Sequence, residues 1–212
     1  MPEIETARLL LRMFNQDDLD DLARIYADAE VMRYLSGHPL TREETAGWLS
    51  YFLSGWEQYG FGWWAVVLKE SGQLIGHCGL QFIHVTPEIE LTYGLARTYW
   101  RKGLASEAAR ACLRYGFEGL QLDRIYALAD PGNIGSHRVM ERVSMTYDRT
   151  EYYKDDLYEG DLIYYVIERG EYLAGDAPYS LREVSGDDTR ISFSRAFEAR
   201  QLEWKSAKAG GM

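Results

Sequence analysis

A single glycine separates a basic pair from a run of small residues in the segment YWRKGLASEAA, residues 99–109. Arg101 and Lys102 precede Gly103, and the residues after it have helical spacing. The free N–H groups and the dipole at a helix start attract anions. Gly103 would let the backbone approach a diphosphate, so this segment is a candidate phosphate-binding loop. An ordinary strand-to-helix turn with a packing glycine would give the same pattern.

The histidines and cysteines show no spacing typical of metal ligands. Cys78 and Cys112 stand in apolar stretches, as expected for buried thiols in a reducing compartment. His77 lies in the middle of a predicted strand and is the histidine most able to approach a site, although we expect a structural role for it. We therefore predict that the protein holds no metal.

The elements that position this loop alternate between strand and helix patterns. Period-two and continuous apolar runs predict strands, and apolar residues spaced by three and four predict helices. The predicted order is β-α-α-β-β-β-α-β-α-β-β, which favours an α/β fold with a mixed sheet and helices on both faces. The predicted strands are residues 8–14, 63–69, 74–82, 88–96, 123–129, 145–153 and 161–168; the predicted helices follow residues 15–21 and 41–44 and span 106–120 and 136–143.

The pattern changes after Gly170. We predict one domain over residues 1–170 and a C-terminal extension over residues 171–212. Within the extension, residues 192–205 could form a helix with Phe193 and Phe197 on one face. That helix would dock on the domain or on a second copy of the chain, which leaves a homodimer open; a disordered tail is the alternative.

The formal charge of −10 argues against nucleic acid as a partner, because phosphate backbones require a basic surface. It would favour cationic substrates, but it also serves solubility. No apolar run approaches the roughly 18 residues of a membrane span, and the first residues lack a signal-peptide core. We therefore expect a cytoplasmic protein that does not enter a membrane.

The loop resembles the acetyl-CoA pyrophosphate loop of the GNAT acetyltransferases, which follows the pattern Q/R-x-x-G-x-G/A. Gly103 and Ala105 match this pattern, whereas Trp100 occupies its first position, where the pattern has Gln or Arg. The surrounding residues resemble the Rim-type branch, the ribosomal-protein N-acetyltransferases and their relatives.

Three further segments resemble that branch in the same order along the chain. They are TARLLLR at 6–12, IGHCGL at 75–80 and DPGNIGS at 130–136, so the resemblance covers residues 6–170. It implies a GNAT fold, with a central mixed sheet of about seven strands flanked by helices on both faces.

The resemblance also implies which residues would hold acetyl-CoA as a co-substrate. A splayed sheet would bind the pantetheine arm through backbone groups, and the loop would bind the pyrophosphate. Asn133 would use its amide toward the arm, although capping of the next helix explains it too. The implied binding residues are Leu95, Ala96, Arg97, Arg101, Lys102, Gly103, Leu104, Ala105, Ser106 and Asn133.

The implied reaction is direct transfer of an acetyl group to a primary amine, on a protein N-terminus or a small molecule. Glu90 is the candidate base, because strand alternation places it on one face with Glu88 and Thr92. Ser136 could protonate the departing thiolate or order a water. Many GNAT enzymes carry a tyrosine acid where this chain has Met140.

Two other functions fit parts of the pattern. A non-catalytic acyl-CoA-binding sensor or interaction module would keep Gly103 and Asn133 but would need no base. An antibiotic or polyamine acetyltransferase would differ only in its acceptor pocket.

Overall fold

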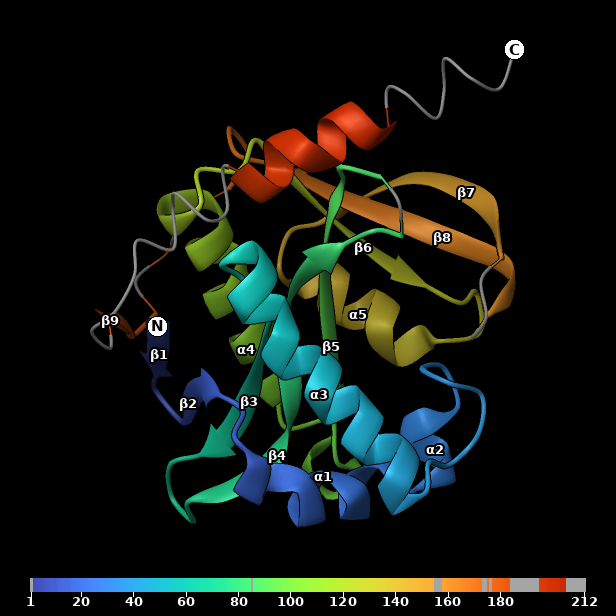
Figure 1. Cartoon of the computed structure of the whole chain (residues 1–212). Coiled ribbons are helices and arrows are strands. Elements are labelled where there is room, and N and C mark those ends of the chain that lie inside the picture. Colours follow the sequence, from blue (N-terminus) through green and yellow to red (C-terminus); the bar gives the residue numbers. More distant parts are fainter. Residues whose placement is uncertain are drawn as a thin grey trace.

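The computed structural model describes residues 2–84, 86–154, 158–172, 175, 177–183 and 195–204. Within these ranges nine strands form one sheet in the order β7-β8-β6-β5-β4-β3-β2-β1-β9 (Figure 1). Neighbouring strands are antiparallel except β5 and β6, which are parallel. The strands are β1 Pro2–Thr6, β2 Leu9–Met13, β3 Trp63–Leu68, β4 Gln73–Phe82, β5 Ile89–Leu95, β6 Arg124–Ala129, β7 Thr146–Lys154, β8 Glu159–Glu168 and β9 Tyr179–Glu183.

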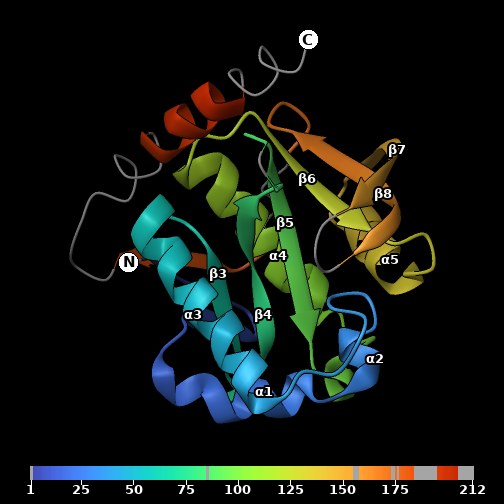
Figure 2. The same ribbon diagram turned by 45° about the vertical axis from the view of Figure 1, so that its right-hand side comes forward.

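Helices cover both faces of the sheet, as predicted. Figures 1 and 2 show α1 and α3 in front of β3 and β4, and α4 behind them. The numbered α-helices are α1 Leu19–Tyr26, α2 Ala29–Met32, α3 Arg42–Tyr59, α4 Leu104–Arg114 and α5 Ile134–Arg142, and a π-helical turn, Tyr115–Gly119, continues α4. A further helix spans residues 195–204, and we call it the C-terminal helix.

Side chains alternate along β3, so they enter two hydrophobic cores, one on each face of the sheet. Trp63 and Val67 point to the side of α1 and α3, whereas Trp64 and Val66 join the core under α4. Thr41 and Glu44 form the predicted capping box at the start of α3. Small buried residues on α4, such as Ala108 and Cys112, let this helix lie close to β4 and β5.

The sheet is larger than the sequence predicted, with nine strands in the described residues instead of about seven. The predicted strand at residues 8–14 corresponds to β2, and β1 precedes it as a separate strand. β9 then pairs antiparallel with β1, so residues beyond Gly170 extend the same sheet. The division into a domain and an extension at residue 170 stays a prediction.

The C-terminal helix packs against the carboxyl-terminal end of β4. The Phe197 ring stacks on Phe82 with their centroids 6.5 Å apart. Arg200 donates from Nη2 to the carbonyl oxygen of His84 over 2.8 Å. Phe193 and the ends of the predicted helix at 192–194 and 205 lie outside the described residues. Among the residues described, no helix has the length and apolarity needed to cross a bilayer.

Candidate active site

The parallel strands β5 and β6 meet at one point and then diverge. Their register joins Glu90 to Tyr126 and contains no second pair within these two described strands. Figure 2 shows β5 and β6 separating toward their carboxyl ends. A cavity of about 580 Å³ opens there, and Glu90, Tyr93, Asn133 and Ser136 all contribute to its lining. The structure therefore brings three predicted site residues together around one opening in the sheet.

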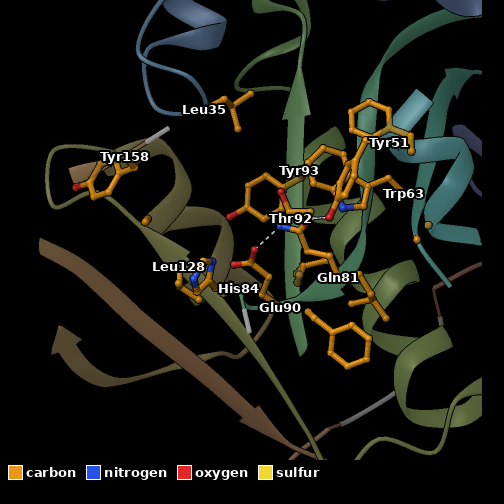
Figure 3. A pocket seen from close by; sticks show the side chains of 18 of the residues that line it. Leu35, Tyr51, Trp63, Gln81, His84, Glu90, Thr92, Tyr93, Leu128 and Tyr158 are labelled. Atoms are coloured by element: carbon orange, nitrogen blue, oxygen red, sulfur yellow. Dashed lines mark hydrogen bonds between the residues drawn. The ribbon is translucent and has the colours of Figure 1, made fainter. Parts of the chain in front are cut away.

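Glu90 lies where the two strands meet, and its carboxylate enters the cavity (Figure 3). The Gln81 side chain donates from Nε2 to Glu90 Oε1 over 2.5 Å. Tyr51 in turn donates its hydroxyl to Gln81 Oε1 over 3.4 Å. Glu88 instead forms an ion pair with Arg149 over 3.5 Å and is outside the cavity lining. The two neighbouring glutamates therefore have different surroundings, and of the two it is Glu90 that lines the cavity.

Tyr93 is a cavity residue that the sequence analysis missed. Its hydroxyl lies 2.8 Å from Ser136 Oγ and 3.1 Å from the Ser136 carbonyl oxygen. Burial raises the pKa of Tyr93, so its hydroxyl keeps its proton at neutral pH. The signal in the sequence was a tyrosine near the carboxyl end of the strand that leads into the predicted phosphate loop.

Asn133 is the N-cap of α5. Its Oδ1 accepts the backbone N–H of Ser136 over 3.1 Å, which is the capping role expected as one of its two explanations. The cap uses the side-chain oxygen, so the amide N–H groups stay available toward the cavity that Asn133 lines. The same contact fixes the backbone of Ser136, whose hydroxyl faces Tyr93.

The predicted phosphate loop leads directly into α4. Gly103 is the N-cap residue with φ of +75°, and Arg101 also has a positive φ, of 61°. The backbone N–H of Glu107 donates to the Gly103 carbonyl oxygen in the first helical hydrogen bond, over 3.1 Å. The N–H groups of the first helical residues therefore have no acceptor inside the helix, and alternating φ signs favour a concave, anion-binding backbone. These first residues are Leu104, Ala105 and Ser106.

Arg8 holds this loop from the side of β2. Its Nη1 donates to the Lys102 carbonyl over 2.9 Å, and its guanidinium pairs with Glu107 over 2.6 Å. Partial burial acts to raise the pKa of Glu107, but the hydrogen bonds from Thr6 and Arg8 together outweigh it, so the pKa lies below its usual value. The loop is thus fixed from outside, and its own residues 101–106 do not line the cavity between β5 and β6.

Backbone groups at the end of β5 already have partners in the protein. Ala96 donates its N–H to Ile75 over 2.8 Å, and the Trp100 indole donates to the Leu95 carbonyl over 2.7 Å. Arg97 pairs with Asp28 over 3.1 Å. The Trp100 bond gives a physical reason for tryptophan in the loop's first place, because the indole ties the loop to β5. Contacts from Leu95, Ala96 and Arg97 to a pantetheine arm stay a prediction.

His77 belongs to the core, whereas His84 lines the cavity. His77 has no exposed surface, stacks on Trp63 at 4.7 Å and lies 2.7 Å from the Tyr26 hydroxyl through Nδ1. Burial lowers its pKa to about 3. His84 enters the cavity lining, which its sequence spacing did not indicate. No three His, Cys, Asp or Glu side chains gather as a metal site in the described parts of the chain.

Comparison with known proteins identifies a family. The model of the acetyltransferase (GNAT) domain matches residues 8–146. The Bacillus subtilis protein YkkB is 36% identical over 151 residues, covering 70% of this chain and 87% of its own. YnaD of the same organism, named an N-acetyltransferase, is 32% identical over 173 residues, covering 80% and 98%.

A solved structure supports the same assignment. The GNAT-family acetyltransferase from Bacillus anthracis aligns with a TM-score of 0.69 at 29% identity, covering 80% of this chain and 99% of that one. The match confirms the α/β fold predicted from the loop and the three further segments. The chain belongs to the GNAT acetyltransferase family.

Proposed function

We propose that this protein is an N-acetyltransferase that moves an acetyl group from acetyl-CoA directly to a primary amine. The observation that carries the proposal is one cavity, opened between β5 and β6, with Glu90 on one part of its wall and the Tyr93–Ser136 pair on another. Direct transfer needs a group that accepts the amine proton and one that protonates the departing thiolate. These residues are of the right types for both roles.

The residues of the chain fit acetyl-CoA as the co-substrate, which supplies the activated acetyl group. Gly103 presents backbone without a side chain, and the first N–H groups of α4 suit a pyrophosphate. Ser106 Oγ is buried and meets no hydrogen-bond partner among the described residues, so it can donate to a bound group. Arg101 and Lys102 add positive charge to the same loop.

Glu90 accepts the amine proton in this proposal, directly or through a water molecule. An α-amino group with a pKa near ~8 is already about one-tenth neutral at pH 7, so a modest base suffices. The Gln81 amide orients the carboxylate by donating to one of its oxygens.

Tyr93 and Ser136 hold the proton for the leaving thiolate. Both hydroxyls lie where the cavity separates the strands, and each can pass a proton to the other across 2.8 Å. This pair would replace the tyrosine that many GNAT enzymes carry where this chain has Met140. Met140 is fully buried and belongs to the core.

The acceptor can be a protein N-terminus or a small-molecule amine. A cytoplasmic enzyme without nucleic-acid or membrane partners agrees with the charge and composition, and a homodimer stays a prediction. A non-catalytic acyl-CoA-binding module remains the competing function.

Release of free CoA, measured with peptide N-termini, aminoglycosides and polyamines as acceptors, tests the proposal. We expect release that depends on one amine class, with an N-acetylated product identified by mass spectrometry. Glu90→Gln should slow the same reaction while acetyl-CoA still binds. Tight acetyl-CoA binding without amine-dependent release from any acceptor would instead support the non-catalytic module.

A further inference from the structure

The C-terminal helix contributes a charged residue to the wall of the candidate active site. Arg200 lines the same 580 Å³ cavity as Glu90, although 110 positions separate them in the sequence. Figure 1 shows this helix lying across the end of the sheet, beyond the carboxyl end of β4. Phe197 fixes the helix by stacking on Phe82, and the Arg200 guanidinium lies 5.2 Å from the centre of the same ring.

The guanidinium of Arg200 is only partly satisfied by the protein. Its Nη2 donates to the His84 carbonyl over 2.8 Å, and its Nη1 lies 3.6 Å from Glu203 on the same helix. The Glu203 side chain is 70% exposed, so this ion pair is weak. Arg200 Nε is buried and has no hydrogen-bond partner among the described residues. The guanidinium therefore keeps unused hydrogen-bonding capacity beside the cavity that Arg200 lines.

Glu90 and Arg200 place opposite charges around one cavity. Both act on the Tyr51 hydroxyl: burial chiefly raises its pKa, Glu90 raises it further, and Arg200 lowers it. Aromatic side chains form much of the wall near them, including Tyr51, Tyr59 and Phe82. An acceptor whose amine approaches Glu90 would therefore pass an apolar wall and present its other end to a cation.

We propose that the acceptor is a small amine that carries a carboxylate, and that Arg200 binds this carboxylate. The proposal rests on the proposed function and names its substrate class. Carboxylates suit a guanidinium because they can accept two parallel N–H bonds from it. The C-terminal helix thereby becomes part of the acceptor site and determines its specificity.

A homologous series of straight-chain ω-amino carboxylates, each compared with its own carboxamide, tests the proposal. At saturating acetyl-CoA we expect kcat/KM for the best carboxylate to exceed that for its amide by roughly tenfold or more, the range of a hydrogen bond to a charged group. Arg200→Gln should bring this ratio close to one, and Arg200→Lys should retain part of it. Arg195→Gln is the matched control, because Arg195 lies on the same helix but is exposed and outside the cavity lining.

An unchanged carboxylate-to-amide ratio in Arg200→Gln would overturn the proposal, as would an equal loss in Arg195→Gln. Thermal melting of each variant shows whether the fold survives. Binding of the same probes in the presence of CoA, followed by NMR titration, does not require turnover. Selective carboxylate binding that Arg200→Gln abolishes would support this inference even if no amine were acetylated, and that result would count against the proposed function alone.

Discussion

The Tyr93 hydroxyl lies 2.8 Å from Ser136 Oγ, which links the end of β5 to the first turn of α5 across the opening in the sheet. Asn133 caps the same turn and fixes the Ser136 backbone. The pair therefore lies at a defined place in the cavity, between two elements that otherwise diverge. Its protons would be available to a thiolate leaving group formed there.

Removing the Tyr93 hydroxyl should slow the chemical step. We expect Tyr93→Phe to lower kcat by roughly a hundredfold, the lower range for a lost general acid, with little change in KM for acetyl-CoA. Tyr99→Phe is the matched control, because the Tyr99 hydroxyl bonds to Gln73 away from the cavity. Steady-state kinetics check both variants, and an unaltered kcat in Tyr93→Phe would assign proton donation elsewhere.

A branched residue at Gly103 should weaken acetyl-CoA binding. Its φ of +75° is strained for valine, while a Cβ there would meet only an Arg8 nitrogen at 3.6 Å. The loss should therefore come from a distorted loop backbone. Asn tolerates this conformation, so Gly103→Asn should bind more tightly than Gly103→Val. Calorimetry that gave all three proteins the same affinity would remove the loop from the binding site.

The sequence predicted most elements because their signals are local. The capping box at Thr41 and Glu44, the apolar spacing of α3 and the glycine before α4 each lie within a few residues. β1 and β9 escaped prediction because five-residue strands gain their stability from pairing with distant partners. The pairing of β1 with β2 and of β9 with β1 could not be derived from any one of these segments alone.

Candidate site residues could be named from the sequence where one segment carries several of them, as DPGNIGS carries Asn133 and Ser136. Glu90 could be named from the alternation of its strand. Tyr93 and Arg200 could not be assigned, because their roles depend on which distant segments face them across the cavity. Strand alternation even places Tyr93 on the face opposite Glu90, and the opening between β5 and β6 makes both accessible.

The buried imidazole of His77 should make stability depend on pH. Its folded pKa of about 3 lies below the ordinary value of 6.5, so the native state favours the neutral ring. This contribution is complete above about pH 6.5 and is lost as pH falls from 6.5 toward 3. The free energy of unfolding of the wild type should fall more steeply there than that of His77→Gln, by up to ~1.4 kcal/mol per pH unit. The free energy of unfolding is measured by urea denaturation at each pH. The same pH dependence of this free energy in both proteins would contradict the prediction.

The pH dependence of Glu90→Gln tests the central claim most directly, because it asks whether one carboxylate in the cavity between β5 and β6 deprotonates the amine. At saturating acetyl-CoA, kcat/KM for the amine is measured from about pH 6 to pH 9 in the wild type, in Glu90→Gln and in the control Glu88→Gln, whose native side chain pairs with Arg149. We predict a loss in Glu90→Gln that is largest at low pH and shrinks as the free amine loses its own proton, with Glu88→Gln close to wild type. An equal loss at every pH, or no loss at all, would contradict the account.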